Sequence, residues 1–385
     1  MRARLLAVPV CCLAFATARC GTSSADAPQG AAASGGAGGG GGADGGGTDG
    51  GTASNECDGL SADPNATSIA ITAPSEECGI AAISDSSGNV ALSSGSDAFT
   101  SRSWATYDRS GGRLGTLHSN SPVTPRSSGF FGLDHFSSPD PPSDAYHLWT
   151  FAPDGSGPSE SVGGFLCRTA LHRTSAGGVL LTGTCGSGIR SASRVVWYDD
   201  AGAQKWLAWV DAFPVSSAMG DSAGNVLIAA SSDAVPGRPA GDLLGRWITP
   251  SGSVAGDWFV IVSGNAAPAV LHSKIDGGAA VMQDGKWVAV LPPLGIPQPP
   301  PEWLTSRRGQ DFQIVRGRKA YAFTSLIVAS GSPGGPSVEV VTPSGKSCGT
   351  FDTKGFAATV GADGTVVANT DNCTRKMWPG LLGQR

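Results

Sequence analysis

Apolar residues along this chain recur in short runs, and each run follows a polar turn that ends in glycine. The segment DSAGNVLIAA at 221–230 places Asp, Ser and Gly before five consecutive apolar residues, and DSSGNVALSS, TSAGGVLLTG and GADGTVVANT repeat the pattern. Asp or Ser early in a turn with Gly late in it is typical of the turns that join antiparallel strands. Each copy therefore predicts a β-hairpin whose second strand is buried.

The hairpins recur with a regular period. Their turn glycines are 40 to 53 residues apart and lie at Gly88, Gly129, Gly177, Gly224, Gly277, Gly317 and Gly364. Behind most of them follows an aromatic or apolar strand closed by another turn, as in VVWYDDAGA and GRWITPSGS. Each unit thus predicts four strands, a to d in chain order. A period in the forties made of short strands is typical of β-propeller blades.

Radial stacking explains why one chain repeats this unit. A four-stranded sheet cannot cover both of its faces alone, whereas blades packed around a ring cover one another. We predict an all-β propeller over residues 56–385 with seven four-stranded blades, six or eight being the alternatives. The fifth blade is abbreviated, because the Pro-rich insert LGIPQPPPEW stands where its outer strand is expected. The last unit ends early, and TSIAITA at 67–73 is expected to supply its outer strand and close the ring.

The first twenty residues predict export. Two arginines precede an apolar run from Leu5 to Ala16, which is too short to span a bilayer, and small residues precede Cys20. Residues 1–19 are therefore interpreted as a signal peptide. The segment resembles a bacterial lipoprotein signal, which implies acylation of Cys20. Arg19 departs from that pattern, and ordinary cleavage after Ala18 is the alternative.

Residues 20–55 hold the candidate anchor and a tether. Gly, Ala, Ser, Thr and Asp make up almost the whole segment, so it cannot bury enough apolar surface to fold. The lipoprotein resemblance implies a location in the cell envelope, held by the lipid on Cys20, and Gly21 favours the outer membrane. The formal net charge of −5 shows no basic footprint for nucleic acid.

Cysteines outside the signal predict disulfides. Cys11 and Cys12 leave with the signal, and six others follow Cys20: Cys57, Cys78, Cys167, Cys185, Cys348 and Cys373. An even number in an exported chain favours disulfides over a metal site. Cys167 and Cys185 lie at similar distances from the turn of blade three, so we predict that they pair across its hairpin. Nearness in the sequence predicts Cys57 with Cys78 and Cys348 with Cys373.

The turn motifs also carry a family resemblance. DSSGNVALSS and DSAGNVLIAASS, with GRWITPSGSV behind, resemble bacterial SBBP-type and quinoprotein-like β-propeller repeats. The resemblance covers Gly79 to about Asn369. It implies blade geometry and says almost nothing about chemistry, because such propellers serve as scaffolds, binding modules and enzymes.

Candidate binding residues follow from the expected blade geometry. Propellers bind ligands on the face that carries the b-to-c and d-to-a loops. Arg102, Arg190 and Arg238 lie in b-to-c loops and could meet an anionic group, or else they are solvated surface charges. His172 and His272 each precede the turn glycine of their blade by five residues, where blade four has Met219. They could converge and share a metal or ligand; the alternative is a pair of buried, hydrogen-bonded histidines inherited with the repeat.

No zinc-protease helix motif occurs in the chain, and neither that motif nor a nucleophile elbow would fit a repeat of β-hairpins. The leading hypothesis is therefore a monomeric, lipid-anchored envelope propeller without a cofactor. It would act as a non-catalytic binding or scaffold module for a protein or carbohydrate, and not for nucleic acid. The rival hypothesis is a propeller-type hydrolase or lactonase-like enzyme with a metal in the channel, held by His172 and His272.

Overall fold

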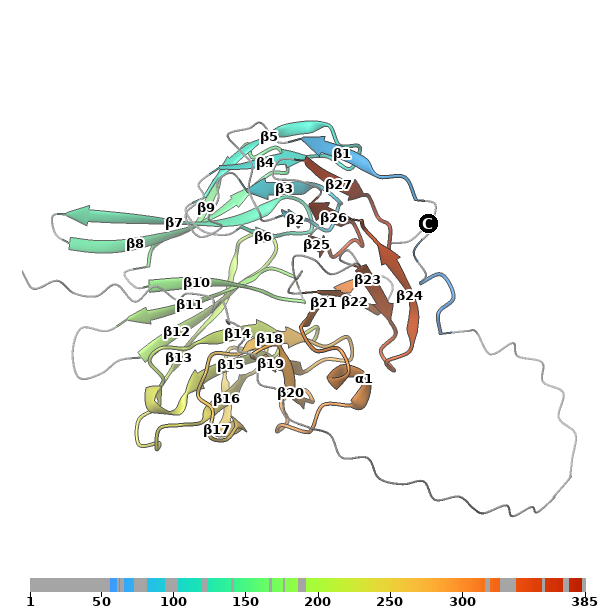
Figure 1. Cartoon of the computed structure of the whole chain (residues 1–385). Coiled ribbons are helices and arrows are strands. Elements are labelled where there is room, and N and C mark those ends of the chain that lie inside the picture. The colour runs from blue at the N-terminus through green and yellow to red at the C-terminus, as the bar shows by residue number, and fades with distance from the viewer. Residues whose placement is uncertain are drawn as a thin grey trace, which may run out of the picture. The chain divides into compact units, whose positions relative to one another are not determined.

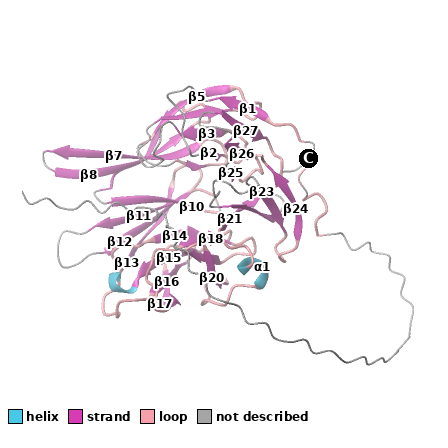
Figure 2. Ribbon diagram, viewed as in Figure 1, coloured by secondary structure: helices cyan, strands magenta, loops and turns pink. Residues whose placement is uncertain are grey.

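The computed structural model consists almost wholly of β-strands (Figure 2). It describes residues 56–60, 62, 66–72, 82–93, 103–119, 123–139, 142–165, 168–175, 177–185, 192–315, 319–325, 337–354, 357–369 and 374–382. Two short helices interrupt the strands of this part, the 3₁₀ helix η2 (Ser232–Ala234) and α1 (Glu302–Thr305). No helix in it is long and apolar enough to cross a membrane.

Seven antiparallel sheets form a ring, which confirms a seven-bladed β-propeller (Figure 1). Blade one contains β2 (Ala82–Ser84), β3 (Val90–Ser93), β4 (Ser103–Tyr107) and β5 (Arg113–His118). Blade two contains β6 (Thr124–Pro125), β7 (Phe130–Pro139), β8 (Pro142–Phe151) and β9 (Ser159–Phe165). Blade three contains β10 (Arg168–Arg173), β11 (Val179–Cys185), β12 (Ala192–Tyr198) and β13 (Gln204–Val210).

The later blades keep the same order of strands. Blade four contains β14 (Ser217–Gly220), β15 (Val226–Ser231), β16 (Leu243–Ile248) and β17 (Val254–Val262). Blade five contains β18 (Val270–Ser273), β19 (Ala279–Gln283) and β20 (Lys286–Leu291). Blade six contains β21 (Gln310–Val315), β22 (Ala320–Ser325), β23 (Ser337–Val341) and β24 (Ser347–Asp352). Blade seven contains β25 (Ala357–Val360), β26 (Val366–Asn369), β27 (Thr374–Trp378) and, from the other end of the chain, β1 (Ile69–Thr72).

The apolar residues on the two faces of each blade pack against the neighbouring blades. The buried side chains of the described residues fall into seven apolar clusters, one for each seam between consecutive blades. Strand β15 shows why: Leu227 packs in the seam to blade five and Ile228 in the seam to blade three. The first strands of the blades contact one another and form the inner wall of the ring.

The ring closes between the two ends of the chain, as the sequence predicts. Strand β1 pairs antiparallel with β27 in the register Ile69↔Met377 to Thr72↔Thr374. Ile71 is buried with Val90 of blade one and Val367 of blade seven. The N-terminal strand thus supplies the fourth strand of blade seven and fills the last seam.

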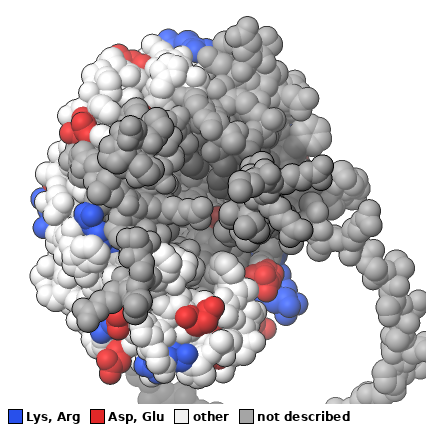
Figure 3. All heavy atoms as spheres, turned by 90° about the vertical axis from the view of Figure 1, so that its left-hand side faces the viewer, with Lys and Arg blue, Asp and Glu red and all other residues white. Residues whose placement is uncertain are grey.

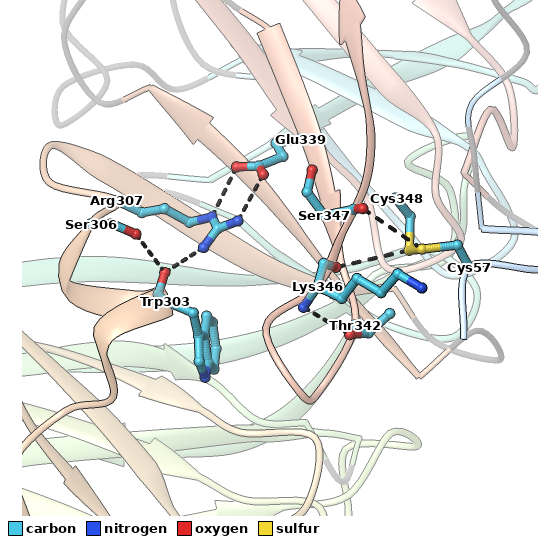
Figure 4. Close-up of polar contacts among 9 residues, drawn as sticks. All are labelled: Cys57, Trp303, Ser306, Arg307, Glu339, Thr342, Lys346, Ser347 and Cys348. Carbon is cyan, nitrogen blue, oxygen red and sulfur yellow. Dashed lines mark hydrogen bonds and ion pairs between the residues drawn. A yellow bond between two sulfur atoms is a disulfide. The ribbon is translucent and has the colours of Figure 1, made fainter. Parts of the chain in front are cut away.

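A disulfide strengthens this closure but contradicts two predicted pairings. Cys57, ahead of β1, is bonded to Cys348 on β24 of blade six (Figure 4). The predicted pairs Cys57 with Cys78 and Cys348 with Cys373 are therefore wrong. Ring closure places the N-terminal segment beside a blade that is distant in the sequence, and the two bonded cysteines are 291 residues apart. Cys78, Cys167 and Cys373 lie outside the described residues. The hairpin register Arg168↔Thr184 is the one that the predicted pair Cys167 with Cys185 requires.

Blade five has three strands, in agreement with the predicted abbreviation. The Pro-rich segment takes the place of the fourth strand, and Val290 and Gln298 exchange two backbone hydrogen bonds of 2.9 and 2.8 Å. Helix α1 follows, and Trp287 Nε1 donates to the carbonyl oxygen of Arg307 at 3.1 Å. Proline has no amide hydrogen to donate, so this segment covers the edge of β20 without itself becoming an edge that pairs with other chains.

An ion pair fastens the end of this segment to blade six. Arg307 Nε and Nη2 donate to the two carboxylate oxygens of Glu339 at 2.8 and 2.7 Å (Figure 4). Burial alone would raise the pKa of Glu339, but the hydrogen bonds and the charge of Arg307 bring it below its ordinary value. Glu339 is therefore ionised at neutral pH and holds the covering segment in place.

The repeated aspartate links consecutive blades. The Asp221 carboxylate accepts hydrogen bonds from the amides of Ala223 and Asn225 in its own turn, and from the amide of Gly278 in blade five at 3.0 Å. Asp85 does the same in blade one and accepts from the amide of Gly129 in blade two at 2.8 Å. Gly278 has a φ of +75°, and a Cβ there would lie 2.1 Å from the Leu291 carbonyl oxygen, so only glycine fits.

We predict that Asp221→Ala lowers the free energy of unfolding by about 2–3 kcal/mol, because buried amides of two blades lose their acceptor. Urea unfolding at neutral pH measures it. The matched control is Asp108→Ala, whose carboxylate accepts from Ser110 and Gly112 within its own exposed turn and from no other blade. An equal loss of unfolding free energy in both variants would show that the hydrogen bond between blades adds no stability.

We predict that peptide mapping under non-reducing conditions finds Cys57 linked to Cys348. Cys57→Ser should lower stability by about 3–5 kcal/mol, because the bond restricts a long loop in the unfolded chain. Cys348→Ser and the double variant should show the same loss, since all three remove one bond. A double variant much less stable than either single variant would contradict the pairing.

Candidate functional site

A cavity of about 310 Å³ lies at the inner wall of the ring, where the first strands of blades three to six face one another. Blade four contributes Met219 from β14, blade five contributes Leu271 and His272 from β18, and blade six contributes Phe312 and Ile314 from β21. Side chains on these strands point into the seams between blades and toward the centre of the ring, so we expect apolar residues to line the cavity. The volume suits a small molecule or a single side chain of a partner.

The cavity opens at the end of the ring that sequence reasoning did not favour. Ser175, Ser222, Ile275 and Lys319 line it, and all four come from the turns between first and second strands. The b-to-c loops lie at the other end of an antiparallel blade. Arg238, in the b-to-c loop of blade four, is exposed, donates to the carbonyl oxygen of Trp258 at 3.1 Å and does not line the cavity. Arg102 and Arg190 lie outside the described residues.

His272 is the most distinctive residue of the cavity. Its side chain is 8% exposed, and its ring centroid lies 5.1 Å from those of Trp287 and Phe312. Nδ1 lies 3.2 Å from Oδ1 of Asp311 on β21. Nε2 is buried and has no hydrogen-bond partner within the part of the chain that the structure describes. A buried polar atom without a partner beside a cavity indicates a place for water or for a ligand.

The surroundings of His272 set its protonation. Burial lowers the pKa of the imidazole below its ordinary value, and the nearby Asp311 carboxylate offsets this only in part. The ring is therefore neutral at pH 7. A carboxylate beside Nδ1 favours the tautomer with hydrogen on Nδ1, so that Nε2 is a hydrogen-bond acceptor. His272 can thus receive a hydrogen bond from a ligand, or a proton in a reaction.

Hydroxyl groups form the opposite wall. Ser175 Oγ of blade three lies 2.7 Å from Ser273 Oγ of blade five, so the two turns meet across the short first strand of blade four. The Ser175 amide donates to the Gly220 carbonyl oxygen at 3.1 Å, and Thr174 forms a parallel bridge with Gly220. These contacts fix blades three, four and five to one another, and the polar wall is therefore built into the ring.

The structure does not bring the two predicted histidines together. His172 Nε2 lies 2.8 Å from Thr182 Oγ1 on the next strand of its own blade, and His172 does not line the cavity. Among the described residues there is no group of three or more His, Cys, Asp or Glu side chains that could hold a metal ion. His172 therefore fits the alternative of a buried histidine with a hydrogen bond inside its blade.

A second hollow lies at the seam of blades three and four, beside Trp197 and Trp206. Both indoles are at most 8% exposed. Asp199 there accepts from two amides of its own turn and pairs with Lys205 at 2.9 Å. Its polar groups already have partners in the protein, so this hollow is a weaker candidate than the cavity.

The surface shows no concentrated charge on the face of Figure 3. The described Lys, Arg, Asp and Glu side chains are scattered there, and in places a positive and a negative side chain adjoin.

Comparisons with known proteins leave the ligand open. No family model matches the chain, and no curated protein matches it. Among solved structures, a eukaryotic initiation factor is similar at 10% identity and a TM-score of 0.41, over 82% of this chain and 88% of that one. TolB from Acinetobacter baumannii is similar at 13% identity and a TM-score of 0.35, over 77% of this chain and 78% of that one. A gluconolactonase from Xanthomonas campestris is similar at 12% identity and a TM-score of 0.35, over 81% of this chain and 99% of that one.

Sequence reasoning identified His272 but missed its surroundings. Asp311 and Lys319 belong to blade six, whose first turn reads RGRK and does not follow the repeated pattern. The available signal was this departure itself, because three basic residues surround Gly317 where other turns have Asp and Ser. The resemblance to SBBP-type repeats remains a prediction.

We predict that His172 makes stability depend on pH. Burial lowers its pKa to about 4, so the folded protein does not take up the proton that the unfolded chain binds near pH 6.5. Its contribution is therefore complete above about pH 6.5 and is lost as the pH falls toward 4. Urea unfolding from pH 7 to 5 should show a shallower loss in His172→Gln than in the native chain. Equal slopes would contradict the assignment.

Proposed function

We propose that the protein is an extracytoplasmic binding or scaffold module, without catalysis, that recognises a protein or carbohydrate partner. The observation that carries this proposal is the cavity between blades three and six, with the orphaned Nε2 of His272 beside it. A rigid ring of seven blades presents this cavity without needing to close over a ligand. A preformed pocket lowers the entropic cost of binding.

The proposal includes attachment to the cell envelope. Acylation of Cys20 would hold the module at the outer membrane, and residues 21–55 would let it reach a partner. The Cys57–Cys348 disulfide supports export, because such bonds persist in oxidising compartments. The module would work as a monomer and without a cofactor.

A hydrolase is the second candidate, and one observation favours it. Asp311 Oδ1 lies 3.2 Å from Nδ1, although the two atoms do not form a hydrogen bond, and a neutral histidine beside a carboxylate could act as a general base that activates a water molecule toward an ester or lactone. No described side chain is placed as an activated nucleophile. The metal-dependent version receives no support from the described residues.

We predict that ligand-observed NMR with a library of small fragments detects binding to the full chain, and that Ser222→Tyr abolishes most of it by filling the cavity. Ser222 is an exposed turn residue at the rim. Ser251→Tyr, on another exposed turn of blade four, should leave binding unchanged. Equal binding by both variants would place recognition elsewhere and contradict the proposal.

The same proteins separate binding from catalysis. Turnover of an ester and lactone panel that disappears in His272→Gln would replace the binding module by the hydrolase. Intact mass of protein from native membranes tests the anchor: a chain that begins at Cys20 and carries acyl groups is expected. A chain without acyl groups would contradict lipid attachment.

A further inference from the structure

We propose that the cavity is specific for a small carboxylate that has a compact apolar body and one hydrogen-bond donor. The inference rests on the proposed binding function, and it assigns a small molecule to the cavity in place of a group of a protein or carbohydrate partner. Three features of the lining carry it: a cation at the rim, an apolar wall and a neutral acceptor in the interior.

The cation is Lys319, in the turn between β21 and β22. It is the one charged side chain among the described residues that line the cavity. It forms no salt bridge with any residue that the structure describes. An exposed ammonium at the mouth of the cavity, with no salt bridge to a described residue, attracts a negative charge, and a carboxylate supplies one.

The backbone of Lys319 supports a role beyond folding. Its φ is +48°, in the left-handed region where glycine or asparagine is more stable than lysine. Residues kept in such conformations gather at binding sites, where the side chain is needed despite the strain. The other first turns with a described residue in this region use glycine, as at Gly224 and Gly277.

The apolar wall defines the body of the ligand. Met219, Leu271 and Phe312 are each at most 8% exposed, and Ile275 and Ile314 complete this side. This wall favours an apolar ligand body, while the remaining lining holds the polar residues Thr174, Ser175, Ser222, Ser273 and Gln313. An aliphatic or aromatic ring suits the apolar wall.

The acceptor is Nε2 of His272. Since the imidazole is neutral with hydrogen on Nδ1, Nε2 accepts from a hydroxyl or amine of the ligand and would not pair with its carboxylate. Asp311 contacts the other edge of the ring and does not line the cavity, so its negative charge does not face the ligand. We therefore expect Lys319 to contact the carboxylate of the ligand and His272 to contact its hydrogen-bond donor.

Isothermal calorimetry on the full chain at pH 7 tests this with 4-hydroxyphenylacetate as the probe. Its neutral amide and the phenylacetate that lacks the hydroxyl should each bind about tenfold more weakly. Equal affinity for acid and amide would overturn the inference.

Variants assign each preference to its residue. Lys319→Met should weaken binding of the acid about tenfold and leave the amide unchanged, and Lys319→Arg should retain the preference. The matched control is Lys286→Met, because Lys286 is an exposed lysine at the start of β20 that does not line the cavity. Lys319→Asn should lose the preference with an unchanged or higher melting temperature, because asparagine tolerates the left-handed conformation. His272→Phe should remove the preference for the hydroxyl; if it does not fold, the comparison of the two acids on the native chain still decides.

The outcomes separate the inference from the proposed function. If fragments bind in the cavity and Ser222→Tyr blocks them, yet acid and amide bind equally, the module stands and the carboxylate specificity fails. If neither probe binds at millimolar concentration and Ser222→Tyr changes nothing in the fragment screen, both fail.

Discussion

Closure of the ring is the constraint on which the rest of the structure depends. Each blade has two apolar faces, and a chain of seven blades leaves two faces exposed unless the first and last meet. Strand β1 on β27 brings them together, and Ile71 fills the seam that results. The Cys57–Cys348 bond holds the same end of the chain to blade six, so that the closing strand does not depend on its four pairs alone.

The cavity lies beside a seam that lacks the repeated aspartate link between blades. Asp221 locks blade four to blade five, but the corresponding position in blade five is Lys274, which pairs with Asp276 of its own turn. The seam between blades five and six instead contains Trp287, Phe312 and Tyr321, and the Tyr321 hydroxyl accepts from the amide of Ile275 at 3.1 Å.

Most of the fold could be predicted from the sequence, because one local rule is repeated seven times. The turn glycines marked every hairpin, and the Pro-rich insert marked the blade with three strands. The disulfide could not be predicted by the same reasoning, since proximity in a closed ring is unrelated to proximity in the chain. For the site, repeat position singled out His272 and misled about His172, because the same position faces different seams. Asp311 and Lys319 come from a blade that does not follow the pattern, and only three-dimensional packing brings them to His272.

Different residues of the same turn stabilise the ring and line the cavity, so a rigid ring can carry a specific site. In the turn of blade four, Asp221 and Asn225 are buried and hold the turn, whereas Ser222 between them is exposed and lines the cavity. A change at Ser222 alters the lining without breaking the bond to Gly278. Blade six separates the two roles more strongly, because the backbone of Lys319 has a left-handed conformation that is unfavourable for lysine. That strain is tolerated because β21 and β22 pair through six consecutive residues on each strand and hold the turn between them. The stability of the ring thus permits a local conformation that the turn alone would not maintain.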